Sequence, residues 1–199
     1  YYQIEDHGKW KVKKKSDQIS FTHFLENKDY AYEYVKTERL IPGKPLLEIS
    51  HTLKNRGQST IETSVYCHNF FVIDSTTIGP AYVVKFPFTI KAGEQKPGNI
   101  AYVKDNAVYF NRDLVKGEIT SISGLTGFGS DPKDYDIRIE NQKTGAGVRI
   151  IGDRPISRIV FWTNPKTLCP EPYINIKIEP GKEFTWKLTY EFYELDIKN

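Results

Sequence analysis

Apolar and polar residues alternate with a period of two along most of this chain, and that period constrains the fold more than any other feature. A period of two places successive side chains on opposite faces of a β-strand, so each such segment buries one face and exposes the other. No segment combines a helical period with helix caps. The clearest alternation lies in the last strand, where the apolar side chains are Phe184, Trp186, Leu188, Tyr190 and Phe192.

Turn signals separate the alternating segments at short intervals. Three short segments each contain Gly together with Pro or Asn, residues that favour tight turns: Ile41–Lys44, Asn55–Gln58 and Pro180–Lys182. We therefore predict an all-β, antiparallel sandwich or barrel, with 101–110 as a further strand or an irregular connection. Before the last strand, the predicted strands are 18–25, 30–40, 46–54, 60–73, 81–90, 118–123, 135–141, 147–151, 156–162 and 173–179.

Composition and charge exclude several classes of protein. The net charge is only +3 with both signs interspersed, so no nucleic-acid partner is expected; the basic run Lys9–Lys15 fits an exposed strand edge. No apolar run is long enough to span a membrane, so no membrane partner is expected. Cys67 and Cys169 form neither a disulfide framework nor a CxxC zinc motif, and we expect no metal and no cofactor.

Common catalytic motifs are missing from the sequence. It contains no GxSxG nucleophile elbow, no GxxxxGK[ST] phosphate loop and no HExxH metal motif. The glycines of Gly124–Gly129 lack the strand-to-helix setting that phosphate binding needs. Adjacent strand residues point to opposite faces, so Cys67 and His68 do not form a nucleophile–base pair.

Among the four histidines, His68 has the most unusual neighbours. His7 lies in a polar turn, while His23 and His51 fall on the apolar sides of their strands and fit a structural role. His68 shares a strand face with Tyr66 and Phe70. An imidazole in an aromatic cleft can act as a general acid if a carboxylate keeps it protonated, and from the residues alone a structural role is equally plausible.

The candidate carboxylate is Glu171, which lies between Pro170 and Pro172. Prolines fix φ and remove donors, so this carboxylate is predicted to project from rigid backbone outside a hydrogen-bonded ladder. A solvated glutamate in a surface loop is a slightly favoured alternative. Trp162, with Thr163 and Asn164 after it, offers a stacking platform with hydrogen-bonding side chains, or is simply part of the core.

Several ordered segments together resemble the aldose 1-epimerase (galactose mutarotase) superfamily, especially its divergent bacterial members. The resemblance covers roughly residues 45–195 and departs from the family at Ile137, where the family has His. The segments are LEISHTLKNRG at 47–57, SVYCHNFF at 64–71, Tyr135–Asp136, FWTNP at 161–165 and LCPEPY at 168–173.

The resemblance implies an antiparallel β-supersandwich, with residues 1–199 as a single domain that forms the C-terminal portion of a longer mutarotase-like chain. It implies His68 as general acid and Glu171 as general base, meeting in space. It also implies a monosaccharide or sugar-containing ligand. The implied sugar-binding residue is Asp136, with Asp134 as its competitor. Trp162, Asn164, Tyr66 and Phe70 are the further candidate substrate-binding residues.

The activity that this resemblance implies is an isomerase reaction, the interconversion of sugar anomers. A base removes the proton of the anomeric hydroxyl while an acid protonates the ring oxygen, on opposite sides of the pyranose, and the ring opens without metal or cofactor. The alternative is a non-catalytic carbohydrate-binding or accessory supersandwich domain of a larger carbohydrate-active enzyme, because a fold alone does not determine function.

Overall fold

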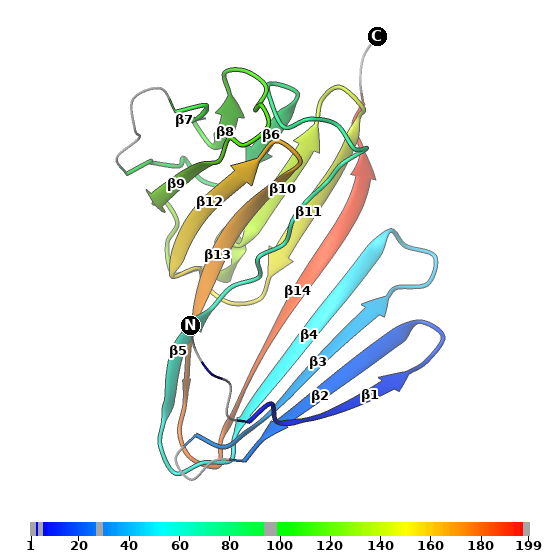
Figure 1. The fold of residues 1–199 in the computed structure, drawn as a ribbon, viewed down its shortest axis with the longest axis vertical. Coiled ribbons are helices and arrows are strands. Elements are labelled where there is room, and N and C mark those ends of the chain that lie inside the picture. The colour runs from blue at the N-terminus through cyan, green and yellow to red at the C-terminus, as the bar shows by residue number, and fades with distance from the viewer. Residues whose placement is uncertain (1–2, 4–5, 27–29, 94–98, 197–199) are drawn as a thin grey trace. The chain divides into compact units, whose positions relative to one another are not determined.

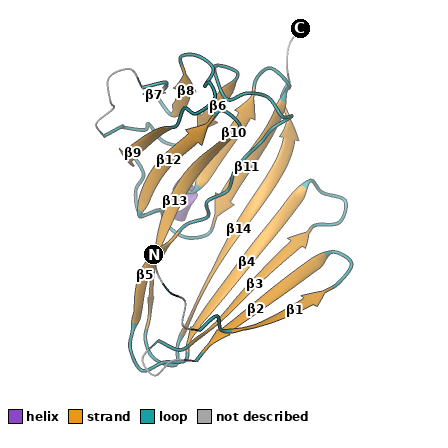
Figure 2. Ribbon diagram, in the orientation of Figure 1, coloured by secondary structure: helices purple, strands orange, loops and turns teal. Residues whose placement is uncertain are grey.

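The computed structural model describes residues 3, 6–26, 30–93 and 99–196 (Figure 1). Apart from the short 3-10 helix Pro132–Asp134, the regular elements of these residues are β-strands (Figure 2), and the strand pairs with an assigned register are antiparallel, which confirms the predicted fold class. No helix in the described part of the chain has the length and apolar character needed to cross a membrane. The strands are β1 Lys9–Lys14, β2 Gln18–Leu25, β3 Tyr32–Leu40, β4 Leu46–Asn55, β5 Ile61–Val65, β6 Tyr82–Lys85, β7 Ala101–Lys104, β8 Ala107–Phe110, β9 Thr120–Leu125, β10 Asp136–Asn141, β11 Ala146–Gly152, β12 Arg158–Asn164, β13 Thr167–Ile178 and β14 Glu183–Glu194.

The chain forms two compact units rather than one continuous cluster of contacts. Unit 1 consists of residues 1–64 and 175–189, and unit 2 consists of residues 65–174 and 190–199. The two long strands β13 and β14 each contribute residues to both units.

Unit 1 is a meander in which β1, β2, β3 and β4 pair in sequence order and β4 pairs with the first part of β14. Its histidines make the structural contacts that the alternation predicts. The Nδ1 atom of His51 lies 2.7 Å from the Tyr34 hydroxyl oxygen, and the His51 ring stacks on Trp186 with centroids 4.6 Å apart. His23 lies 3.1 Å from the Tyr32 hydroxyl and stacks on Trp10.

Unit 2 is a sandwich of two sheets. One sheet has the strand order β14-β11-β10-β6-β8-β7, and the other has β13-β12-β9. The core lies between them, where Ile137 and Ile139 of β10 and Ile159 and Phe161 of β12 are all fully buried. Phe110 of β8 contacts Phe161 across the layers, with ring centroids 6.1 Å apart. Residues of β12 and β13 that alternate with these core residues therefore point away from the core, onto what we call the outer face of β12 and β13.

The segment between β5 and β6 is anchored through buried polar contacts in unit 2. The hydroxyl of Tyr82, a fully buried residue, donates a hydrogen bond to the carbonyl of Ile73 at 2.8 Å and lies 2.7 Å from the Thr76 hydroxyl. Asn141 donates its side-chain amide to the same Thr76 hydroxyl at 2.7 Å. Because a buried polar group is costly unless it is hydrogen-bonded, this network holds 73–82 in one conformation.

Some predicted strands end or divide where the sequence did not indicate it. The predicted strand 60–73 stops at Val65, and the predicted strand 101–110 is a hairpin of β7 and β8 that turns at Asp105, whose φ is 53°. The segment 168–173, read from its prolines as backbone outside a ladder, lies instead within β13 and pairs with β12. The reason for the first and last of these differences lies in the candidate site.

Candidate functional site

The register between β13 and the segment after β5 is set by one pair of residues. Phe71 donates its amide to the carbonyl of Leu168 at 2.9 Å, and Leu168 donates back to Phe71 at 3.2 Å. In a strand, the backbone N–H and C=O groups of every second residue point to the same neighbouring strand. The residues two and four positions after Leu168 therefore point their backbone groups toward the segment that carries Phe71. These residues are Pro170 and Pro172, which have no N–H to donate. The prolines do not disturb the pairing of β13 with β12. On the other edge of β13 they prevent a regular hydrogen-bond ladder with residues 66–70.

Counting outward from that pair, His68 lies opposite Glu171 on the outer face of β12 and β13. Its Nε2 atom is 3.4 Å from Oε1 of Glu171. The His68 side chain is 38% exposed, whereas that of Glu171 is 7% exposed. The structure thus brings together the two residues that the sequence nominated, with the carboxylate buried beneath a solvent-accessible imidazole.

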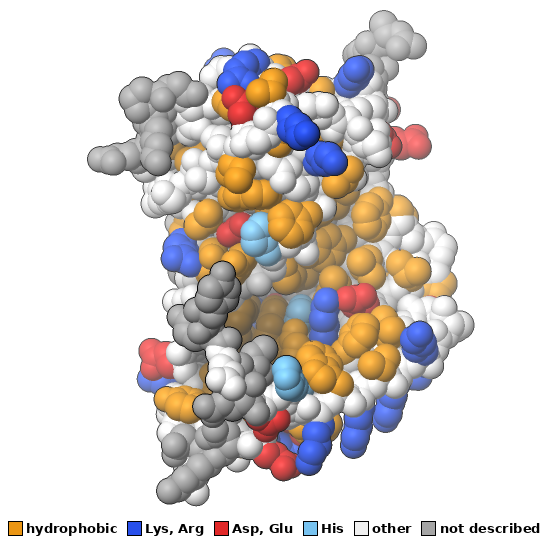
Figure 3. Space-filling model, in the orientation of Figure 1, with side chains coloured by type: hydrophobic (Ala, Val, Ile, Leu, Met, Phe, Trp, Pro, Cys, Tyr) orange, Lys and Arg blue, Asp and Glu red, His pale blue; other side chains and the backbone are white. Residues whose placement is uncertain are grey.

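Aromatic side chains surround this pair. The Phe70 ring lies 4.5 Å from the His68 ring, and the Trp162 ring lies 5.7 Å from both, measured between centroids. Tyr66 lies on the other side of His68, at 6.1 Å. Phe70 is 58% exposed and Tyr66 is 41% exposed, so this apolar surface is open to a ligand. Figure 3 shows hydrophobic side chains beside histidine side chains on the face of the molecule that it presents.

Cys169 is the third polar group beside the pair. Its sulfur and the ligand atoms of His68 and Glu171 lie within 4.8 Å of one another. Burial is the main cause that raises the pKa of the Cys169 thiol, and the neighbouring Glu171 carboxylate raises it further. The set offers one nitrogen, one sulfur and one oxygen ligand, a combination that suits Zn²⁺, although zinc binds the thiolate and the raised pKa favours the thiol.

Two residues of this face were missed in the sequence. Arg158 pairs with Tyr173 across β12 and β13, and its guanidinium carbon lies 3.8 Å from the centre of the Tyr173 ring. Tyr66 stacks on the same Tyr173 ring at 4.2 Å. A hydrogen bond to Tyr173 is the main cause that raises the pKa of Tyr66. Aligning 158–164 against 167–173 as a hairpin would have revealed Arg158 beside Tyr173.

Asp136, a predicted sugar-binding residue, lies on a different surface. It alternates with the buried Ile137 along β10, so its side chain points away from the core on the far sheet of the sandwich. There Arg149 donates two hydrogen bonds to its carboxylate, both at 2.7 Å. The competitor Asp134 accepts a hydrogen bond from the amide of Gly129 and thereby holds a loop. The structure brings neither aspartate to His68.

Asn164, another predicted binding residue, has a local role in the structure. Its side-chain oxygen accepts hydrogen bonds from the amides of Lys166 at 2.8 Å and Thr167 at 3.0 Å. These contacts close the turn that joins β12 to β13. Asn164 therefore fixes the hairpin that presents Trp162 and Glu171, and its oxygen is already engaged.

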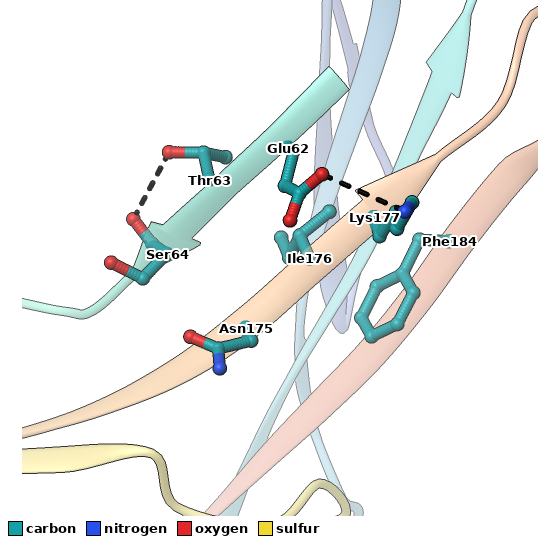
Figure 4. Close-up of a pocket in the computed structure, with 7 residues that line it drawn as sticks. All are labelled: Glu62, Thr63, Ser64, Asn175, Ile176, Lys177 and Phe184. Atoms are coloured by element: carbon teal, nitrogen blue, oxygen red, sulfur yellow. Dashed lines mark hydrogen bonds and ion pairs between the residues drawn. The ribbon is translucent and has the colours of Figure 1, made fainter. Parts of the chain in front are cut away.

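Unit 1 contains a shallow pocket of about 520 Å³ on the strands β5, β13 and β14 (Figure 4). An ion pair between Glu62 and Lys177, at 3.7 Å, lies at its wall, and Phe184 supplies an apolar side. The ion pair joins two exposed side chains, and the pocket holds none of the residues that the sequence nominated.

No family model and no curated protein matches the chain. Comparison with solved structures shows that its fold is a known one. A galactose mutarotase related enzyme from Lactobacillus acidophilus is 15% identical with a TM-score of 0.68, over 94% of this chain and 72% of that one. The GalM/aldose epimerase homologue from C. elegans is 12% identical with a TM-score of 0.66, over 94% and 69%. This chain has the galactose mutarotase-like fold.

A further match is the galactose 1-epimerase from Lactobacillus acidophilus NCFM, at 8% identity and a TM-score of 0.58, over 94% of this chain and 67% of that one. These matches confirm the β-sandwich fold that the resemblance drawn from the sequence implied. At identities this low the likeness concerns the fold, because one fold can carry many activities. The residues that bear on activity lie on the outer face of β12 and β13.

Proposed function

We propose that this protein interconverts the anomers of an aldose, with Glu171 as general base and His68 as general acid. The observation that carries the proposal is the 3.4 Å contact between His68 and a buried carboxylate on an otherwise aromatic, open surface. An acid and a base within hydrogen-bonding reach of one substrate typically contribute ~10²–10⁴-fold each. The similar structures described as epimerases and mutarotases agree with this assignment.

The geometry changes the expected pose of the sugar. Because His68 and Glu171 contact each other, a pyranose cannot lie between them with one group on either side. The anomeric hydroxyl and the ring oxygen are both bonded to the anomeric carbon, so an adjacent base and acid can reach them from one edge of the ring. Glu171 then takes the hydroxyl proton while His68 donates a proton to the ring oxygen, and the ring opens.

After ring opening, rotation about the bond between the first two sugar carbons presents the other face of the aldehyde. Closure reverses both proton transfers and yields the other anomer, so the pair returns to its starting protonation state. Phe70 and Trp162 offer the apolar surface on which the carbon face of the sugar stacks. No metal or cofactor is required by this scheme.

The proposal is tested by measuring anomer interconversion directly. Freshly dissolved α-anomers of several aldoses, mixed with the full chain, should reach equilibrium faster than in buffer when followed by polarimetry or ¹H NMR. A protein that binds sugars without accelerating any of these reactions would be a carbohydrate-binding protein on the same fold, and the proposal would be wrong.

A further inference from the structure

Arg158 is a cation without an assigned task beside the proposed site. It lies at the exposed start of β12, and its guanidinium lies over the Tyr173 ring at 3.8 Å. No carboxylate among the described residues forms an ion pair with it, whereas Arg112, Arg138 and Arg149 each have such a partner. A guanidinium that lies over an aromatic ring makes no hydrogen bond to it through its ring face, so its N–H donors are available for an anion.

The position of Arg158 relative to the His68–Glu171 pair follows from the strand register. Glu171 lies opposite Val160, and Tyr173 lies opposite Arg158, two residues further along the same face. Two residues along a strand correspond to roughly 7 Å. The contacts Arg158–Tyr173, Tyr173–Tyr66 and Tyr66–His68 connect the cation to the proposed acid through one continuous row of rings.

We infer that the sugar taken by this site carries an anionic group, which Arg158 binds. This inference rests on the proposed function, because it takes the His68–Glu171 pair as the point where the anomeric end sits. In an aldohexopyranose the exocyclic carbon is attached to the ring carbon beside the ring oxygen. A phosphate ester or a carboxylate on that carbon would extend away from the proton-transfer site. Arg158 lies in that part of the face, beside Tyr173, which is two residues along β13 from Glu171.

The arrangement of the face supports this orientation. Phe70 and Trp162 form its apolar side, whereas Tyr66, Tyr173 and Arg158 form the side that carries hydroxyl and guanidinium donors. A sugar with one charged end and an apolar ring face matches this asymmetry. Planar, two-pronged donation is the way in which guanidinium groups recognise phosphates and carboxylates.

The test measures equilibrium binding, which does not depend on catalysis. Calorimetric titrations of the full chain use glucose, glucose 6-phosphate and glucuronate as probes. Arg158→Gln should weaken binding of glucose 6-phosphate and glucuronate roughly 10- to 100-fold, because these sugars lose a hydrogen bond between charged groups. Glucose has no charged group, so its binding should change less than about twofold. Arg138→Gln, a half-exposed arginine on the opposite sheet, is the matched control and should change neither.

A loss confined to glucose 6-phosphate narrows the class to phosphate esters, and a loss confined to glucuronate narrows it to sugar acids; both support the inference. Equal binding of charged and neutral sugars, or equal binding by the wild type and Arg158→Gln, overturns it. If Arg158→Gln does not fold, Arg158→Lys replaces it and should give a smaller loss, because the charge remains without the planar donor pair.

Anomer exchange measured in the same samples separates the inference from the proposed function. Binding of charged sugars that depends on Arg158, without faster anomer exchange, would remove the epimerase assignment and leave the ligand class standing. Faster anomer exchange of neutral sugars, with no effect of Arg158→Gln on binding, would support the epimerase assignment and remove the inference of an anionic ligand.

Discussion

His68 and Glu171 lie directly opposite each other on neighbouring segments of unit 2, with Nε2 of the imidazole 3.4 Å from Oε1 of the carboxylate. The contact depends on Pro170 and Pro172, which cannot donate the hydrogen bonds that would draw 66–70 into the sheet. The strand that carries Glu171 is held in the sheet by its pairing with β12. The segment that carries His68 is not paired in the same way, and its imidazole stays accessible.

The first prediction concerns the aromatic surface beside the pair. Trp162→Ala removes the ring that contacts both His68 and Phe70, so sugar affinity should fall about tenfold, in line with the cost of losing one stacking partner. Titration of the sugar by calorimetry gives the dissociation constant. Trp10→Ala, which removes an exposed ring in unit 1, is the control and should leave the affinity unchanged. Equal affinities of the two variants would show that Trp162 is not part of the binding surface.

The second prediction concerns the buried network that follows the His68 segment. Tyr82→Phe deletes the hydroxyl that donates to the Ile73 carbonyl and contacts Thr76, so a buried hydrogen bond of the network is lost. The free energy of unfolding should fall by about 1–2 kcal/mol, as measured by urea denaturation. Tyr102→Phe, in which the ring is half-buried on β7, should cost less than about 0.5 kcal/mol. A change of similar size in both variants would mean that the network contributes nothing specific.

The third prediction concerns pH and the loop after β8. Hydrogen bonds from Arg112, followed by one from the amide of Val115, lower the pKa of Glu118 to about 2. A lowered pKa means that the carboxylate stabilises the loop fully above its ordinary value of 4.5 and loses this effect as the pH falls toward about 2. The amide NMR signal of Val115 should therefore shift near pH 2, and Arg112→Gln should move that midpoint upward. A midpoint near 4.5 in the wild type would contradict the ion pair.

The fourth prediction concerns Cys169. Burial raises the pKa of its thiol, so very little thiolate forms at pH 8, and thiolate is the reactive species. Iodoacetamide should label the half-buried Cys67 well before Cys169 in the native protein, and both in urea, as peptide mass mapping can show. The raised pKa also means that the free energy of unfolding declines above about pH 9, where the unfolded thiol ionises and the folded one does not. Rapid native labelling of Cys169 would contradict its burial.

The sequence predicted the strands best where one face is regularly apolar. Alternation located β2, β4 and β10 to within a residue or two, because burial of a single face fixes both the period and the register. Alternation predicted the wrong end for the strand 60–73. The alternating pattern continues through Tyr66, His68 and Phe70, but β13 beside them has prolines and supplies no N–H donors there. The proline pair that ends the ladder lies about a hundred residues away, so local pattern could not reveal it.

The candidate site was predicted in the same uneven way. His68 and Glu171 could be nominated because an imidazole among aromatics and a carboxylate between prolines are unusual settings. The structure has Asp136 on the other sheet of the sandwich from His68, and the Tyr135–Asp136 motif contains no information about which sheet its strand joins. Arg158 was missed because its role depends on a cross-strand partner, Tyr173, that only the hairpin register identifies.

The most direct test of the account is the rate of anomer interconversion by the wild type and by Glu171→Gln, measured by ¹H NMR with the sugar that the wild type binds best. Glutamine keeps the size of the side chain but cannot accept the proton of the anomeric hydroxyl. The account predicts a rate at least ~10²-fold lower for Glu171→Gln, with unchanged folding by circular dichroism and with Glu62→Gln, a carboxylate outside the site, behaving as the wild type. Equal rates for Glu171→Gln and the wild type would contradict the assignment of Glu171 as the base.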